Sequence, residues 1–212
     1  VYATTDTTYS TALTGAQNAG TYVTHCTGGT SPTYWGVPVD GTLTINKAPT
    51  TATVVCDPTT VVYTGLPQTP CTASVVGTNL NLTGLTPTYT NNVNAGTATA
   101  SATYAGDANH IGSSGQVTFA VNPATATNVI SCPASTTYDG TAQAPCTAVV
   151  TGPAGLNTTA TVTYTNNTNA GTATADATYA GDANHTGSTA TQVTFTIAKA
   201  SSSTVISCPT SV

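Results

Sequence analysis

Apolar and polar residues alternate along short stretches of this chain, and turn-forming residues separate the stretches. Residues 97–104 place every second side chain on one face, and Val193, Phe195 and Ile197 alternate with threonines. A period of two is typical of a half-buried β-strand. Turn-forming sequences such as Asn-Ala-Gly follow at intervals of about 8–12 residues, and no useful helical periodicity is present. The pattern predicts an all-β protein made of tandem small β-sandwiches.

The strand pattern repeats with a period of about 75 residues, which is typical of tandem modules. Cys56, Cys132 and Cys208 each follow a β-branched stretch at the same point of the repeat. The repeat predicts four segments: a divergent, incomplete module at residues 1–47, a module at residues 48–122 (the first repeat), a module at residues 123–198 (the second repeat), and a C-terminal strand at residues 199–212.

Residues 1–47, called the head, match the two repeats only in part. Three positions correspond: Asn18-Ala19-Gly20 to Asn94-Ala95-Gly96, residues 41–46 to residues 117–122, and Tyr2 to Tyr63 and Tyr138. The strand that carries Cys56 in the first repeat has no counterpart in the head. We therefore expect the head to have an open sheet edge and an open core groove.

The C-terminal segment has the sequence of the strand that the head lacks. This favours head-to-tail assembly, in which the segment of one subunit adds a strand to the head of the next and so builds an open polymer. The residues expected to carry this donor strand are Val205, Ile206, Cys208 and Val212.

The cysteines predict a disulfide framework formed in an oxidising compartment. The six cysteines form no Cys-x-x-Cys motif, so zinc binding is not indicated. Two pairs recur in register, Cys56 with Cys71 and Cys132 with Cys146, and each would close a loop of about 15 residues within a module. Cys26 and Cys208 remain. Because two modules separate them, we expect them to pair between subunits; two unpaired thiols are the alternative.

The turn sequences are similar to those of a known class of repeats. Tyr138-Asp139-Gly140, the Asn-Ala-Gly-Thr turns and residues 41–49 resemble the MBG and YDG-type bacterial Ig-like repeats. The resemblance covers nearly the whole chain. It implies an Ig-like fold and a place in a large secreted surface protein, where such modules mostly act as stalks.

Charge excludes several classes of partner. The chain has two lysines, no arginine and seven aspartates, with a formal net charge of −5. Nucleic acid and anionic lipid both need a basic surface, so neither is expected as a partner. The sequence contains no apolar run of about 18 residues, so no membrane span is indicated. We expect a secreted, cell-surface protein that needs no cofactor.

Few residues suggest chemistry. Asp107 with His110, and Asp182 with His185, offer one carboxylate and one imidazole per turn, which is more typical of a hydrogen-bonded turn than of a metal site. No set of nucleophile, base and orienting group is indicated, so we expect no enzyme. Tyr34 and Trp35 form the main aromatic cluster and suit either a sugar ring or a neighbouring domain. Lys47 and Lys199 lie at matching junctions, where an isopeptide bond would lack an assisting glutamate.

The sequence is compatible with three functions. The first is the structural subunit of an extracellular, pilus-like filament assembled by donor-strand complementation and intersubunit disulfides. The second is a stalk segment of a giant multi-module adhesin, in which the next strand continues the same chain. The third is a soluble carbohydrate-binding module, for which Trp35 is the sole support. The pattern favours the first.

Overall fold

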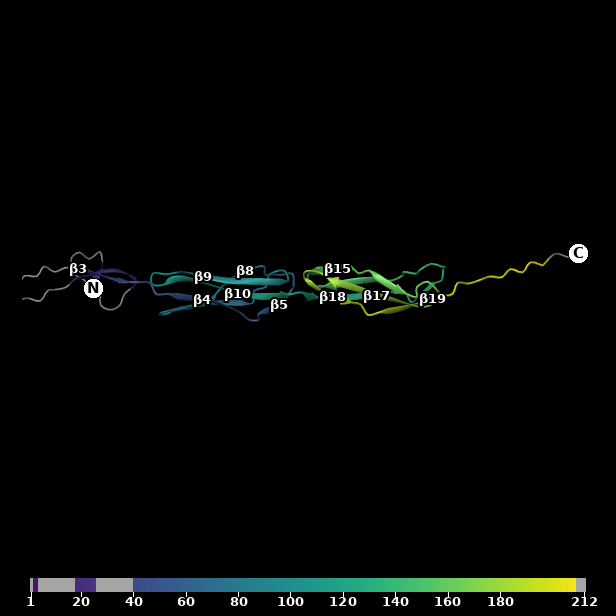
Figure 1. Ribbon diagram of the computed structural model, residues 1–212, viewed down its shortest axis with the longest axis horizontal. Helices are drawn as coiled ribbons and strands as arrows, with labels where there is room; N and C mark the ends of the chain where they lie inside the picture. Colours follow the sequence, from purple (N-terminus) through teal and green to yellow (C-terminus); the bar gives the residue numbers. More distant parts are fainter. Residues whose placement is uncertain (1, 4–17, 26–39, 209–212) are drawn as a thin grey trace, which may run out of the picture. The chain divides into compact units, whose positions relative to one another are not determined.

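The computed structural model describes residues 2–3, 18–25 and 40–208 (Figure 1). Among them no α-helix occurs, and the chain forms several β-sheets, so the all-β class is confirmed. Contacts divide the chain into two compact units. One comprises Val1–Thr59, Pro70–Thr90 and Thr99–Phe119, and the other comprises Thr60–Thr69, Asn91–Ala98 and Ala120–Val212.

The head contributes one three-stranded sheet with the order β1-β2-β3. Its strands are β1 (Tyr2–Ala3), β2 (Gly20–His25) and β3 (Asp40–Ile45). The register pairs Gly20 with Ile45 and Tyr22 with Leu43. In the second repeat the corresponding register pairs Gly171 with Ile197 and Ala173 with Phe195. The alignment of β2 and β3 with the later strands therefore agrees with the pairing.

Tyr2 does not take the position expected for it. It pairs with Val23 of β2, in antiparallel orientation. Tyr63 and Tyr138 instead follow short strands that run parallel to the last strand of their repeats. The expected equivalence of Tyr2 is therefore wrong. The physical reason is that a short extended segment pairs with whichever sheet edge is within reach, because backbone hydrogen bonding carries no register information of its own.

The first repeat contains two sheets, ordered β4-β6-β7 and β5-β10-β9-β8. The strands are β4 (Thr50–Cys56), β5 (Thr60–Val62), β6 (Cys71–Gly77), β7 (Leu80–Leu85), β8 (Thr88–Thr90), β9 (Gly96–Gly106) and β10 (Ile111–Asn122). β4 and β6 are antiparallel, whereas β5 runs parallel to the end of β10.

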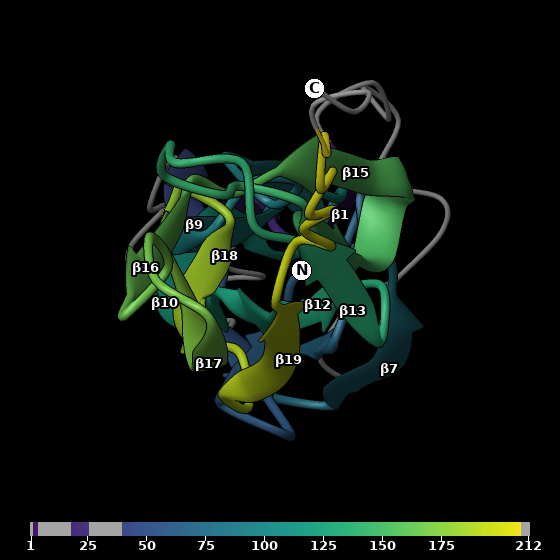
Figure 2. The same cartoon turned by 90° about the vertical axis from the view of Figure 1, so that its right-hand side faces the viewer.

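The second repeat is built in the same way, with one sheet ordered β12-β14-β15 and one ordered β11-β18-β17-β19-β13 to which β16 adds beside β17. Its elements are β11 (Ala124–Thr125), β12 (Thr127–Ser131), β13 (Ser135–Thr137), β14 (Thr147–Gly152), a 3-10 turn at Pro153–Gly155, β15 (Leu156–Thr159), β16 (Val162–Thr165), β17 (Gly171–Gly181), β18 (His185–Thr189) and β19 (Val193–Ala198). Figure 2 shows β16, β17, β19 and β13 in this order.

The alternating pattern buries one face of each sheet. In the second repeat the core joins Ile130 and Ala148 from one sheet to Ala175, Phe195 and Ile197 from the other. Small alanines on β17 let the sheets approach, and the aromatic ring fills the remaining space. Two sheets that pack face to face around such a core have the arrangement of a β-sandwich.

A tyrosine closes one end of each core. The Tyr164 hydroxyl accepts a hydrogen bond from the Cys146 N–H (2.9 Å) and donates one to the Cys146 carbonyl (3.1 Å). Tyr89 makes the same two bonds to Cys71. The Tyr164 ring also meets Phe195 edge to face at 6.1 Å. Each hydroxyl thus satisfies a backbone N–H and a backbone carbonyl beside a buried cysteine.

One extra residue distinguishes the last strands of the two repeats. Six residues separate His110 from Val117, whereas seven separate His185 from Val193. β10 is continuous through this region, but β18 and β19 are two strands. An added residue shifts the side-chain alternation by one, and the break between β18 and β19 lets both halves keep their apolar faces inward.

Candidate interface between repeats

The Gly-Asp-Ala-Asn-His sequence forms a tight turn at one end of each repeat. In the first repeat, Asp107 Oδ1 accepts hydrogen bonds from the N–H groups of Asn109 (2.7 Å) and His110 (2.8 Å). Gly106 has φ +88°, and a Cβ there would lie 2.7 Å from the His110 carbonyl oxygen. Glycine is therefore required at this position, and the aspartate holds the turn as an Asx turn.

The histidine of the turn is bonded at both ring nitrogens. His110 Nδ1 lies 2.8 Å from Asp107 Oδ1, and Nε2 lies 2.9 Å from the Thr78 carbonyl oxygen. Both partners are acceptors, so the imidazole satisfies both only when both nitrogens carry a proton. His110 thereby fastens the turn between β6 and β7 to the Asp-x-Asn-His turn. In the second repeat, His185 makes the corresponding contacts with Asp182 and the Pro153 carbonyl.

These contacts shift the pKa values of the turn residues. The Asn109 N–H, followed by the His110 side chain and the Tyr104 hydroxyl, lowers the pKa of Asp107 to about 2. The Asn184 N–H is likewise the main group that lowers the pKa of Asp182 to about 2. The Thr78 carbonyl and Asp107 raise the pKa of His110 above its usual value. The charged forms of both partners are thus stabilised by the fold.

The asparagine of each turn reaches the preceding module. Asn109 Oδ1 accepts from the Ala19 N–H (2.7 Å), and Asn109 Nδ2 donates to Asn18 Oδ1 (2.9 Å). These residues all belong to one compact unit. Each Asp-x-Asn-His turn therefore holds the Asn-Ala-Gly turn that lies one module earlier.

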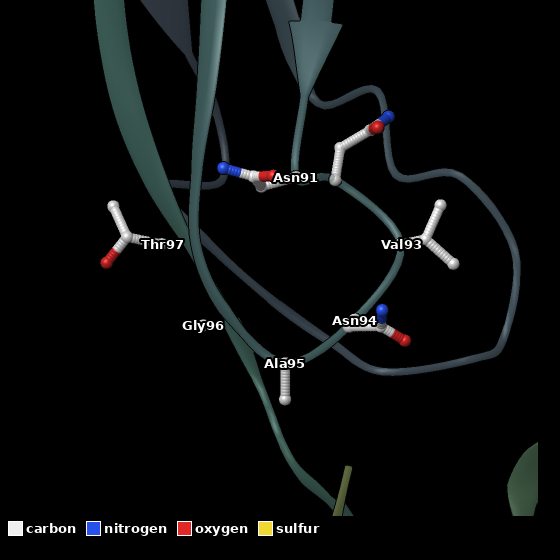
Figure 3. Close-up of a pocket in the computed structure, with 7 residues that line it drawn as sticks. Asn91, Val93, Asn94, Ala95, Gly96 and Thr97 are labelled. Atoms are coloured by element: carbon white, nitrogen blue, oxygen red, sulfur yellow. The ribbon is translucent and has the colours of Figure 1, made fainter. Parts of the chain in front are cut away.

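The second junction repeats this arrangement within the other compact unit. Asn184 Oδ1 accepts from the Ala95 N–H at 2.8 Å, and Asn184 Nδ2 donates to Asn94 Oδ1 at 3.3 Å. Asn94 and Ala95 lie at the tip of the loop that runs from Asn91 to Thr97 (Figure 3). This loop encloses an open hollow of about 390 Å³.

The same turns anchor the entry to each repeat. The Ala48 N–H donates to the Asn109 carbonyl (2.7 Å), and the Ile111 N–H donates to the Ala48 carbonyl (2.8 Å). In the second repeat, the Ala124 N–H donates to the Asn184 carbonyl (2.8 Å). Lys47 Nζ donates to the carbonyl oxygen of Asp107 at 2.7 Å. The turn therefore fixes the start of the first strand as well as the neighbouring module.

Four of the predicted cysteines are joined in pairs. Cys56 is bonded to Cys71 with an S–S distance of 2.05 Å, and Cys132 is bonded to Cys146 with an S–S distance of 2.07 Å. Cys56 and Cys71 lie directly opposite each other on β4 and β6. Each bond thus connects the first long strand of a repeat to its antiparallel neighbour.

The C-terminal segment belongs to none of the sheets described above. Residues 199–208 form no strand, and Cys208 is a free, exposed thiol. Val205 and Ile206 are exposed as well. The predicted site residues Cys26, Tyr34, Trp35 and Val212 lie outside the described residues.

The acidic turns do not gather enough ligands for a metal ion. Within residues 2–3, 18–25 and 40–208, no group of three or more His, Cys, Asp or Glu side chains could hold a metal ion. In the same part of the chain no helix has the length and apolarity needed to cross a membrane. The side chains of Asp107 and His110 instead form hydrogen bonds within the turn itself.

The sequence interpretation identified both turn motifs but missed that they meet. Asn109 and Asn184 carry the contact, and the available signal was that Asn-Ala-Gly and Asp-x-Asn-His recur together at the same period. The chain matches no protein-family model and no curated protein sequence.

Proposed function

We propose that the chain is a structural segment of an extracellular fibre, and that residues 200–208 serve as the first β-strand of a module outside residues 48–198. One observation carries the proposal. Ile206 is 84% exposed, whereas Ile130 and Val54, at the same position of the two repeats, are 7% and 8% exposed. An apolar strand sequence of this kind gains its stability from a partner sheet and a core.

The first candidate for the acceptor is the head of an identical chain. Leu43 of β3 corresponds in register to Phe195, yet it is 40% exposed whereas Phe195 is 2% exposed. An added strand that brought Ile206 over this sheet would cover both apolar side chains. Repeated head to tail, this donor-strand complementation gives a pilus-like filament of Ig-like modules.

A disulfide between subunits would reinforce this assembly. Cys208 is exposed and free to react, and its proposed partner is Cys26 of the next subunit. The two disulfides within the repeats support an oxidising location such as the cell surface. The proposed role needs neither catalysis nor a cofactor.

The second candidate is a stalk segment of a longer adhesin, in which residues 200–208 begin a further repeat of the same polypeptide. The entry residues Ala48 and Ala124 support this alternative, because both bond to an Asp-x-Asn-His turn of the module that they begin. Ala200 lies at the same position of the roughly 75-residue repeat as Ala48 and Ala124. Residues 1–47 contain no Asp-x-Asn-His sequence, so a head offers no such turn for Ala200 to bond to.

The intact mass of purified fibres, boiled in detergent with reductant, separates the two candidates. A filament of subunits gives a species near 20.9 kDa, whereas a continuous stalk gives a much larger one.

For the filament, Ile206→Asp should abolish polymer formation because it places a charge in the acceptor core. Val205→Asp is the matched control, since Val129, its counterpart in β12, is exposed. Polymers that persist with Ile206→Asp would refute donor-strand assembly.

A further inference from the structure

We propose that the turn formed by Asn169, Ala170 and Gly171 is a docking site for an Asp-x-Asn-His turn of another β-repeat. The two earlier Asn-Ala-Gly turns of the chain each hold such a turn through Asn109 or Asn184. The site is a different surface from residues 200–208. The proposal goes beyond the strand exchange argued above, and it rests on the second candidate function, a longer array of repeats, because a head has no such turn.

The loop at this site is built like the loop at the occupied second junction. Asn91 and Asn166 have φ 57° and 58°, and Gly96 and Gly171 have φ 141° and 145°. These dihedral angles favour asparagine and glycine, and they give both loops the same path. The Asn166–Thr172 loop also encloses an open hollow, of about 330 Å³.

Matching hydrogen bonds brace the two loops from behind. The Gln68 N–H donates to the Asn92 carbonyl at 2.8 Å, and Asn92 Nδ2 donates back to the Gln68 carbonyl at 2.9 Å. Gln143 and Asn167 make the same pair of bonds at 2.7 and 2.8 Å. The loop that contains Ala170 is therefore held in its binding geometry before any partner arrives, which lowers the entropic cost of docking.

The three Asn-Ala-Gly turns differ in the solvent exposure of their alanine. Ala19 and Ala95 are half-buried beneath the asparagines that bind them, whereas Ala170 is exposed. No residue within the described part of the chain bonds to the Ala170 N–H or to the Asn169 side chain. The donor and the acceptor that the earlier turns use are thus both presented to solvent here.

The chemistry of the site selects its occupant. A carboxamide is needed, because its oxygen accepts from the alanine N–H while its nitrogen donates to the asparagine oxygen. A carboxylate could make only the first bond. Asp107 and Asp182 set the asparagine in place by bonding to its backbone N–H. The occupant is therefore a repeat of the same kind as residues 48–122 and not a head, whose sequence has no such turn.

In the test, a further repeat replaces residues 200–212 of the chain. Residues 48–122 are joined after Lys199, which recreates the Lys47-Ala48 junction of the chain itself. We expect hydrogen exchange of the Ala170 amide to slow about tenfold relative to the parent chain, as one hydrogen bond closes over it. Its amide shift should move toward that of Ala95. Substituting N109A in the appended copy alone should restore the parent exchange rate.

A second variant guards against a repeat that fails to fold. It carries residues 124–198 after Lys199, so that the counterpart of Asn184 supplies the carboxamide. Exchange of the core amides in the appended copy reports its folding. If neither appended repeat slows exchange at Ala170, or if N109A leaves the slowing intact, the proposal is overturned. Because residues 200–208 take no part in either variant, the result is independent of strand exchange.

Discussion

β12 and the segment that ends at Cys208 have nearly the same sequence and opposite environments. Residues 129–133 and 205–209 both read Val-Ile-Ser-Cys-Pro. β12 pairs along its whole length with β14 and buries Ile130, whereas Ile206 lies exposed in a segment that forms no strand. Local preference is thus insufficient to form this strand. An antiparallel partner and an apolar core create it, as is general for β-structure.

The largest test of this contrast removes the same side chain from both regions. Ile130→Ala should destabilise the second repeat by about 2–5 kcal/mol, because it leaves a cavity against Phe195 and Ala175. Ile206→Ala should leave the free chain unchanged within about 0.5 kcal/mol. Native-state hydrogen exchange of the buried β14 amides measures both. An equal loss of stability in the two variants would show that Ile206 is packed within its own chain.

The disulfides give the next largest difference. Replacing Cys132 and Cys146 together by serine should cost the second repeat about 3 kcal/mol, because the bond closes a loop of 14 residues. Cys208→Ser should not alter the unfolding of the free chain, since Cys208 is unbonded there. Urea denaturation, monitored by hydrogen exchange of the β14 amides, distinguishes the two variants. In fibres, the proposed bond to Cys26 predicts that Cys208→Ser removes the reductant-sensitive ladder on non-reducing gels.

A smaller effect is expected at the junctions. Asn184→Ala deletes two hydrogen bonds to the preceding module and should weaken the junction by about 1 kcal/mol. The expected result is faster exchange at the Ala95 amide with the β14 core unchanged. Asn169→Ala is the matched control, and it should alter no amide of the preceding module in the free chain. Faster core exchange in Asn184→Ala would instead mean that the turn supports its own repeat.

The smallest effect is a pH dependence of the anchor at the start of β4. The lowered pKa of Asp107, about 2, stabilises the turn above about pH 4, and this contribution is lost as the pH falls toward 2. The raised pKa of His110 stabilises the turn below about pH 6.5, and this is lost as the pH rises through the folded pKa.

Protection of the Ala48 amide, corrected for intrinsic exchange, should therefore be greatest between about pH 4 and 6.5. The Ala200 amide, which has no such turn in the described chain, should show no optimum. His110→Asn should remove the alkaline loss and leave the acid loss in place. A flat profile at Ala48 would contradict the assignment of a doubly protonated His110.

The strands of the two repeats could be predicted from the sequence because alternation and burial agree. Phe195 occupies an inward position that the neighbouring Thr194 and Thr196 define. The break between β18 and β19 was not predicted, although the extra residue before Val193 causes it. The two ends of the segment have similar sequences in both repeats, and this similarity conceals the shift between them.

The junction was predicted less well than the fold. The Asx turn at Asp107 follows from local chemistry, and the structure contains it. The contact between Asn109 and Ala19 joins residues 90 positions apart. No local pattern encodes such a pairing, because it depends on which ends of two modules meet. The pairing of Tyr2 with β2 could not be predicted for the same reason.

The disulfides have a mechanical consequence. Each bond joins the end of the first long strand to the start of the next, so β5 and β13 lie inside closed loops of the chain. When a repeat is pulled apart by its ends, tension passes across the sulfur atoms and bypasses these loops. Roughly 45 Å of contour length per repeat then stays in reserve. Reduction would release it, which makes the extensibility of a fibre under load depend on the redox state of its surroundings.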